Sequence, residues 1–292
     1  MSENIAYLLV TASTILFACQ FLFQKKYGES EGEGLRASVT LALLSSIVRI
    51  ILVVILYGVS GYSFTLYGFV CSFFAAVSYC CVILFSAGAL KYANMAKYSV
   101  YMMLGGMVLP FAAGTAFFSE PLTFGKFSGL LLVAAATCFS NLKAGTKTRG
   151  AVKYYIGVFI CNGMNGVISK FNQSSPDGLS ASSFTLLTAA WSVVICAVYL
   201  VVSTARSEKK PLFSSARTAL PQAALYGAAC GIGNLLLLIS LEKLPASVQY
   251  PLVTGGTIVF STIISVIRRE KLNAAMAISV VLAMISAIAV VL

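Results

Sequence analysis

The stretch GGMVLPFAAGTAFFSEPL at residues 105–122 recurs as GGTIVFSTIISVIRREKL at residues 255–272, with a glycine pair, a glutamate and a leucine at the same spacing. The two copies are offset by 150 residues, about half the length of the 292-residue chain. In each copy, long apolar segments lie on both sides of the glutamate. A duplication with so long a period in an apolar chain predicts a membrane protein built from two repeats, because solenoid repeats are much shorter.

The composition indicates a lipid environment. Hydrophobic residues make up 59% of the sequence and charged residues 10%, and the mean hydropathy is +0.92. An ordinary soluble domain has about a quarter of its residues charged. We therefore expect the lipid bilayer as a partner and no nucleic acid. The net charge of +11 is attributed to lysines and arginines in loops beside the membrane.

The residues that build metal, redox and catalytic sites are scarce. Eight cysteines fall inside apolar segments without a CxxC pair, and histidine is absent. We therefore expect no metal site, no disulfide framework and no cofactor. The single aspartate, Asp177, and the lack of histidine leave little from which to assemble a nucleophile and its base. The sequence predicts no catalytic residues and a protein that is not an enzyme.

Long apolar runs separated by polar, glycine or proline breaks predict ten transmembrane helices, because about 20 apolar residues cross a bilayer. The expected helices cover residues 4–23, 35–57, 67–90, 95–118, 124–142, 152–172, 179–203, 220–241, 245–266 and 274–292. Five fall in each copy, residues 1–146 and 147–292. Because five is odd, the second copy enters the membrane in the opposite sense. The predicted fold is an all-α integral membrane protein of two inverted five-helix repeats.

Inverted repeats typically bind a substrate near the midplane between the halves and expose it alternately to each side. A duplicated structural protein without moving parts is the alternative. Polar residues inside the expected helices favour the transporter, because a bundle without a transport path has little need for them.

Basic residues are divided unequally between the two sets of loops. The loops after the first, third, fifth, seventh and ninth expected helices hold sixteen lysines and arginines, and the opposite side holds Lys126, Lys170 and Lys243. The positive-inside rule places the sixteen in the cytoplasm. Both termini are therefore expected on the extracytoplasmic side of a plasma or inner membrane.

Several short motifs resemble one known family. The segments ALKYANMA at residues 89–96 and SLEKLPAS at residues 240–247 each precede a glycine-pair helix, and SEPL and RREKL follow those helices. Gln20 stands five residues before Lys25, and Asn165 stands five residues before Lys170. In order and duplication these motifs resemble the EamA-like branch of the drug/metabolite transporter superfamily. The resemblance implies ten helices, an arginine in the second helix and export of metabolites such as amino acids.

Uncharged polar residues inside the expected helices are the main candidates for substrate contacts, because unpaired polar groups in hydrocarbon are costly. Gln20 and Gln24 share one face of the first helix, as do Asn162 and Asn165 on the sixth. The tyrosines and the tryptophan either stack on a planar substrate or mark membrane interfaces. The candidate substrate-binding residues are Gln20, Gln24, Arg49, Tyr79, Tyr101, Asn162, Asn165, Trp191, Asn234 and Gln249.

Arg49 is the charge placed clearly inside an expected helix. A charge there costs about 2.5–3.5 kcal/mol on insertion scales, so it is expected to face the protein interior. It either binds an anionic group of the substrate or is held structurally by helix carbonyls and hydroxyls such as Ser45 and Ser46.

The other charges lie at helix ends. Lys25 and Lys170 either extend to the lipid headgroups or line the rim of a cavity. Glu120 and Glu270 are expected to pair with neighbouring basic residues, Lys126 in the case of Glu120, or to favour the start of the next helix.

Glycines and prolines mark where helices pack closely or move. Close packing is one interpretation of the glycine pairs, and a hinge that exposes backbone carbonyls is the other. The candidate hinge or packing residues are Gly105, Gly106, Pro110, Pro251, Gly255 and Gly256.

Together these features predict a secondary transporter, monomeric or homodimeric, that moves an amino acid or a related neutral, zwitterionic or anionic metabolite. No acidic residue lies deep in an expected helix, which disfavours proton-coupled antiport of cations. A nucleotide sugar or a lipid-linked solute is the alternative cargo. A non-transporting membrane scaffold or receptor is the alternative class.

Overall fold

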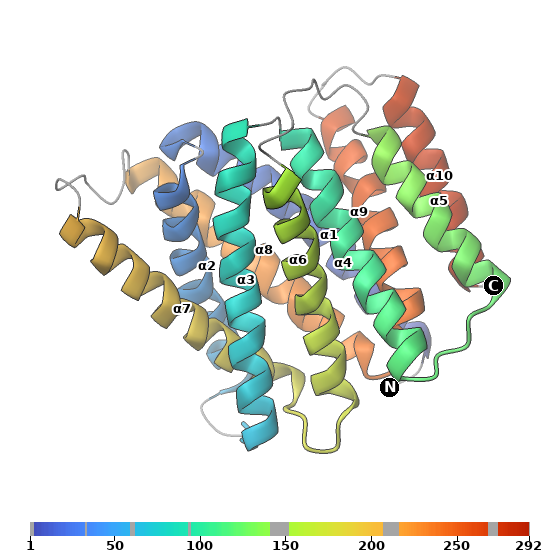
Figure 1. Ribbon diagram of the computed structural model, residues 1–292, viewed down its shortest axis with the longest axis horizontal. Coiled ribbons are helices and arrows are strands. Elements are labelled where there is room, and N and C mark those ends of the chain that lie inside the picture. Colours follow the sequence, from blue (N-terminus) through green and yellow to red (C-terminus); the bar gives the residue numbers. More distant parts are fainter. Residues whose placement is uncertain are drawn as a thin grey trace.

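The computed structural model describes residues 3–32, 34–58, 62–92, 95–140, 152–206, 216–267 and 274–291. Over these residues the chain folds into ten α-helices (Figure 1). They are α1 Glu3–Glu31, α2 Leu35–Tyr57, α3 Leu66–Tyr92, α4 Met95–Phe117, α5 Phe124–Ser140, α6 Val152–Ser174, α7 Ala181–Arg206, α8 Ala216–Leu241, α9 Ala246–Ile267 and α10 Ala274–Val291.

The described helices follow the apolar runs of the sequence, and α1 differs most from its expected bounds. It continues to Glu31 instead of ending near residue 23. The helix stops at Gly32, which has a φ of +82° and donates its amide to the Gly28 carbonyl at 2.8 Å. Glycine adopts this left-handed conformation without steric cost, so the chain can turn there.

Six of the described helices contain a segment long and apolar enough to cross a membrane. The segments are Glu3–Glu31, Leu35–Tyr57, Leu66–Ser86, Ala181–Ser203, Arg217–Leu241 and Ala246–Ile264. Helices α4, α5 and α10 have shorter apolar stretches. Helix α6 carries Asn162, Asn165 and Lys170 along its length, and these side chains lower its hydropathy.

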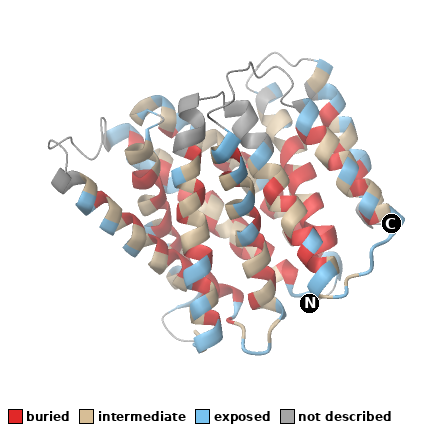
Figure 2. Cartoon of the chain, in the orientation of Figure 1, coloured by how far each residue is buried: buried red, intermediate tan, exposed pale blue. Residues whose placement is uncertain are grey.

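The outer surface of the bundle differs from that of a soluble protein. Exposed residues recur along the helices, and buried ones lie between them (Figure 2). The exposed residues include many large apolar side chains, while hydroxyls and amides are buried together with apolar side chains. Ile55 on α2, Val201 on α7 and Ile288 on α10 are exposed, whereas Ser45, Ser192 and Gln249 are fully buried. Soluble proteins seldom expose apolar surface on this scale, so the outer surface suits contact with lipid.

Helices from the two halves of the chain interleave. Helix α1 packs against α8 and α9, α6 packs against α3 and α4, and α2 and α7 pack against each other. Helix α2 also contacts α8, α7 contacts α3, and α4 contacts α9. Helices α5 and α10 pair at one edge of the bundle (Figure 1), where the Ser286 hydroxyl donates to the Gly129 carbonyl at 2.7 Å. The core is therefore shared between the halves.

Candidate functional site

A cavity of about 300 Å³ lies among helices α1–α4 and α6–α9. Apolar side chains such as Phe17, Phe21 and Phe184 form part of its wall, and many of the remaining lining residues are amides, phenols and hydroxyls. Aspartate, glutamate and lysine are absent from the described lining. The polar lining residues are Gln20, Gln24, Ser38, Arg49, Tyr79, Ser86, Asn162, Asn165, Ser169, Thr185, Thr188, Tyr226, Asn234, Tyr250, Thr254 and Thr257.

Seven of the ten candidate substrate-binding residues lie in this lining. They are Gln20, Gln24, Arg49, Tyr79, Asn162, Asn165 and Asn234. The amide pair on α1 and the amide pair on α6 each point to the cavity from one helix face, because residues three or four apart in a helix lie one above the other. Gly106, a candidate hinge or packing residue, also lines the cavity.

Two of the amides make hydrogen bonds across the bundle. Gln20 Nε2 donates to Tyr226 Oη of α8 at 3.3 Å, and Asn162 Nδ2 donates to the Met102 carbonyl of α4 at 2.7 Å. Gln20 Oε1 is buried and accepts no hydrogen bond from the described residues. The amide of Gln20 thus keeps an acceptor available at the cavity wall.

Arg49 is almost completely buried in the cavity wall, with 5% of its surface exposed. Its Nη2 donates to Ser46 Oγ at 2.7 Å, and its guanidinium carbon lies 4.9 Å from the centre of the Tyr79 ring. The hydroxyl of Ser46, one of the groups expected to hold this arginine, therefore contacts it. Arg49 Nε has no hydrogen-bond partner among the described residues.

Three candidate residues lie away from the cavity. Tyr101 is partly exposed and stacks on Tyr155, with ring centres 4.8 Å apart. Trp191 makes edge contacts with two phenylalanines of α3. Gln249 is fully buried and donates its side-chain amide to the Leu237 carbonyl at 2.7 Å. All three side chains pack against other residues of the bundle and do not line the cavity.

Tyr226 and Tyr250 also line the cavity, although neither is among the ten candidate substrate-binding residues. Tyr226 lies eight residues before Asn234, and this spacing places both near one face of α8. Tyr250 follows Gln249 directly, so it points about 100° away from it around the helix. The Tyr250 hydroxyl donates to the Gly166 carbonyl of α6 at 3.1 Å. Helical spacing from Asn234 is the sequence signal that identifies Tyr226.

The glycine pairs lie where helices approach each other closely. A Cβ at Gly105 would lie 2.7 Å from the Phe159 Cα of α6, closer than side chains tolerate. A Cβ at Gly106 would lie 2.6 Å from Asn162 Nδ2. Gly255 has more room, since its nearest neighbour would be Val133 Cγ2 at 3.0 Å. The absence of a side chain at Gly105 lets α4 and α6 pack backbone to backbone.

Gly256 and the two prolines are the remaining candidate hinge or packing residues. A Cβ at Gly256 would lie 2.9 Å from Thr14 Cγ2 of α1. Pro110 and Pro251 lie inside α4 and α9 and are fully buried. Pro110 cannot donate to the carbonyl of Gly106, one turn earlier, so this carbonyl at the cavity wall lacks its helical partner. The hinge interpretation of these residues stays a prediction.

Glu120 and Lys170 form a buried ion pair at one end of the bundle. Lys170 Nζ lies 3.1 Å from Glu120 Oε1, and both side chains are more than 90% buried. The expected pairing of Glu120 with Lys126 is wrong. Lys126 Nζ instead donates to the Pro121 carbonyl at 3.0 Å. Glu270, expected to behave like Glu120, lies outside the described residues.

The Glu120 carboxylate also caps the start of α9. It accepts hydrogen bonds from the backbone amides of Ala246 and Ser247, each at 2.8 Å. These amides are among the first of α9 and lack partners within the helix, and the helix dipole favours a negative charge beside them. Glu120 thus stabilises a helix start, but that of α9 and not that of the following helix α5.

The backbone before Glu120 is shaped for this contact. Ser119 has a φ of +52°, which is rare for a residue other than glycine. The chain therefore turns sharply after α4, and the Glu120 amide donates to the Gly114 carbonyl at 3.2 Å. Burial of the carboxyl raises its pKa, but hydrogen bonds from Ser247 and Ala246 and the charge of Lys170 lower it more. The net pKa of Glu120 is below its usual value, so the carboxylate is ionised at neutral pH.

The fold and the cavity define an all-helical bundle with an apolar exterior and a polar interior site. No family model matches the sequence, and no curated protein matches it. Solved structures with this fold are known. One, described only as a crystal structure of a protein, is 18% identical over 99% of this chain and 96% of its own, with a TM-score of 0.76. At this identity the similarity shows the fold alone.

Proposed function

We propose that the chain is a multi-pass membrane protein that transports a small organic metabolite by alternating access. The observation that carries this proposal is the polar cavity enclosed by helices of both halves of the chain, inside a bundle whose outer faces are apolar. Transporters built from inverted repeats bind their substrates at such a position, between the repeats. The resemblance of the sequence motifs to the drug/metabolite transporter superfamily supports the same conclusion.

The packing pattern supports two equivalent five-helix repeats. When α1–α5 are exchanged in order with α6–α10, the contacts of α1 with α8 and α9 become contacts of α6 with α3 and α4, which the bundle also contains. The α2–α7, α4–α9 and α5–α10 contacts map onto themselves. This is the pattern expected of a pseudo-twofold axis. With five helices in each repeat, we infer that this axis lies in the membrane plane.

The cavity favours a small cargo. A volume of about 300 Å³ is at the lower end of the range of small-molecule sites, about 300–1,000 Å³. This size suits an amino acid or a metabolite of similar size better than a nucleotide sugar. Amide, phenol and hydroxyl groups from seven helices provide both donors and acceptors for such a solute.

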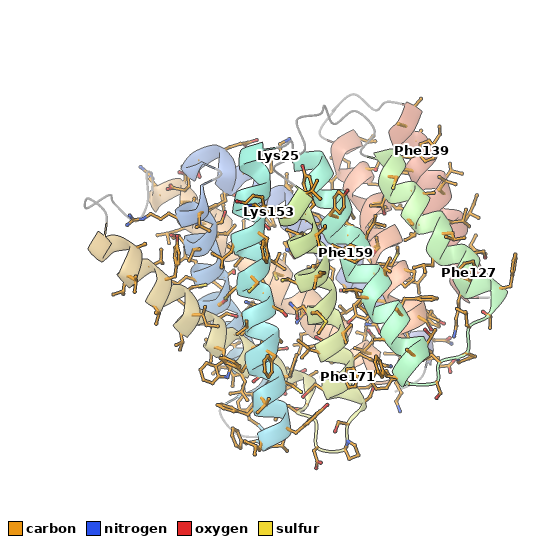
Figure 3. The ribbon with its side chains drawn as sticks, viewed as in Figure 1. Lys25, Phe127, Phe139, Lys153, Phe159 and Phe171 are labelled. Carbon is orange, nitrogen blue, oxygen red and sulfur yellow. The ribbon has the colours of Figure 1, made fainter. Side chains whose placement is uncertain are left out.

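The distribution of charge supports an orientation with both termini outside. Exposed lysines such as Lys25 and Lys153 lie at one end of the bundle, opposite Phe171 (Figure 3). At the end of Phe171, Lys126 and Lys170 are buried in internal contacts, and Lys243 is exposed. Eight of the sixteen basic loop residues lie outside the described residues: Lys143, Lys147, Arg149, Lys209, Lys210, Arg268, Arg269 and Lys271. The positive-inside rule assigns the end with Lys25 to the cytoplasm.

Labelling of single cysteines in a cysteine-free background tests this orientation. We expect a membrane-impermeant maleimide to label Asp177→Cys in intact cells and Lys26→Cys only after permeabilisation, because these two exposed positions lie at opposite ends of the bundle. The opposite labelling pattern would reverse the orientation. Equal labelling of both positions in intact cells would show that helices α2–α6, which connect them, do not carry the chain to the opposite side of the membrane as proposed.

Flux measurements in proteoliposomes test the transport function. We expect saturable flux, inhibited by competing substrate, for at least one solute in a panel of amino acids, organic acids, nucleosides and sugars. Thr188 lies in the cavity wall on α7, so Thr188→Trp should fill the cavity and reduce the flux about tenfold or more. Val198 lies on the outer face of the same helix and is exposed, so Val198→Trp should leave the flux unchanged.

Two results would contradict the proposed function. No saturable flux for any solute of the panel would favour a scaffold or receptor. Equal flux in the Thr188→Trp and Val198→Trp proteins would show that the solute does not pass through this cavity.

A further inference from the structure

Arg49 is a buried cation without a counter-ion in the described structure. The described cavity lining contains no carboxylate, and the carboxylate of Glu120 is bound to Lys170 and to the start of α9. The guanidinium has several N–H donors, and the hydrogen bond to Ser46 uses one of them. Its Nε is buried without a hydrogen-bond partner among the described residues. The charge is thus only partly compensated.

The contacts that Arg49 does make hold its side chain in place. A Cβ at Gly231 of α8 would lie 2.7 Å from Arg49 Cγ, so the absence of a side chain at Gly231 makes room for the arginine stem. The Tyr79 ring packs against the guanidinium, with 4.9 Å between the guanidinium carbon and the ring centre. A hydroxyl and an aromatic ring offset only part of the cost of burying a cation, because most of that cost is lost hydration. The arginine is therefore held at the cavity with unused capacity to bind an anion.

We propose that Arg49 binds the carboxylate of the transported substrate, which makes the cargo a monocarboxylic acid or a zwitterion with a free carboxylate. The proposal rests on the transport function and specifies its substrate class. The planar guanidinium suits the two oxygens of a carboxylate. No second cation lines the described cavity, so one negative charge is matched, whereas a phosphate dianion would remain half compensated. The site disfavours cationic solutes, since the described wall offers them a positive charge and no carboxylate.

The stability of Arg49→Met gives a test that needs no substrate. A binding arginine without a counter-ion costs folding stability, so Arg49→Met should melt at or above the temperature of the wild-type protein in detergent. Arg217→Met is the matched control, because Arg217 is exposed at the start of α8 and does not line the cavity. It should melt as wild type. A melting temperature of Arg49→Met well below both would assign Arg49 to a structural role and overturn the proposal.

Binding of an acid and its amide tests the ligand chemistry. Benzoate should raise the melting temperature of the wild-type protein and of Arg217→Met, whereas benzamide, which has the same shape but no charge, should not. In Arg49→Met the benzoate affinity should fall about tenfold or more, as expected for loss of a charged hydrogen-bonded contact. Equal effects of benzoate and benzamide, or no effect of either on the wild-type protein, would overturn the assignment.

The same variants separate this proposal from the transport function. Arg49-dependent benzoate binding without flux of any solute would keep the carboxylate site and reject transport. Saturable flux that is unchanged in Arg49→Met, with acids and amides carried equally, would keep transport and reject the carboxylate site.

Discussion

Replacing Glu120 with glutamine is expected to cost about 3–5 kcal/mol of folding free energy, the loss measured when one partner of a buried ion pair is removed. Lys170 Nζ, on a side chain more than 90% buried, would face a neutral amide in place of the carboxylate that now lies 3.1 Å away. The first amides of α9 would also lose their ionised acceptor. Thermal or denaturant unfolding of the detergent-solubilised protein measures the effect.

Lys170→Met should lose less folding free energy than Glu120→Gln, and this difference between the two variants is the control. In Lys170→Met, the Glu120 carboxylate keeps two backbone donors and the α9 dipole, so its charge remains compensated. Glu120→Gln combined with Lys170→Met should recover part of the loss, because the unpaired ammonium is removed. Equal costs for the two single variants would show that the helix cap contributes nothing beyond the ion pair.

Because the pKa of Glu120 is lowered, the folding free energy that Glu120→Gln loses should depend on pH. A carboxyl whose pKa is lowered by folding contributes stability above its unfolded-state value of about 4.3, and that contribution is lost as the pH falls through the folded value. The difference between wild type and Glu120→Gln should therefore be constant around neutral pH and shrink below about pH 4. A difference that already shrinks near neutral pH would contradict an ionised Glu120.

The ion pair also joins the two proposed repeats. Glu120 lies between α4 and α5 in the first half, whereas Lys170 and the start of α9 belong to the second half. If the halves rock against each other, opening this end of the bundle separates Glu120 from these partners. The contact would therefore contribute to the energy difference between the closed and open states.

The helices and two faces of the cavity were predictable from sequence because their signals are local. Apolar runs mark the described helices, and a spacing of four places Gln20 and Gln24 on one face whatever packs against it. Asn162 and Asn165 follow the same rule on α6. These residues line the cavity because an amide on an apolar helix is stabilised by facing the interior and not lipid.

Contacts between distant segments were not predictable from one sequence. Glu120 binds the backbone amides of Ala246 and Ser247, which follow it in the chain by 126 and 127 positions. From the sequence alone, the nearby Lys126 is the simpler partner. Which of the neighbours Gln249 and Tyr250 lines the cavity was not predictable for a related reason, since adjacent residues differ by about 100° around a helix and only the neighbouring helices decide which one faces the cavity. Such pairings depend on the tertiary arrangement.

Replacing Gly105 with alanine is expected to destabilise the protein by about 1–3 kcal/mol or more, the usual cost of overpacking a core. The new methyl group would lie 2.7 Å from the Phe159 Cα and closer still to the Phe159 carbonyl. Because these are backbone atoms, no rotamer change relieves the clash, and α4 and α6 would have to separate. The melting temperature in detergent should fall, and the flux should fall with it because α4 and α6 form part of the cavity wall.

Gly255 provides the matched control because it is the equivalent residue of the second copy. A methyl group there would lie 3.0 Å from Val133 Cγ2, a side-chain atom that can shift by a few tenths of an ångström, and 3.4 Å from the Ala283 carbonyl oxygen. Gly255→Ala should therefore cost much less than Gly105→Ala, although the two glycines occupy the same place in the repeat. Similar losses in both variants would mean that the glycines are required for backbone freedom, as in a hinge, and that the close approach of α4 to α6 does not explain Gly105.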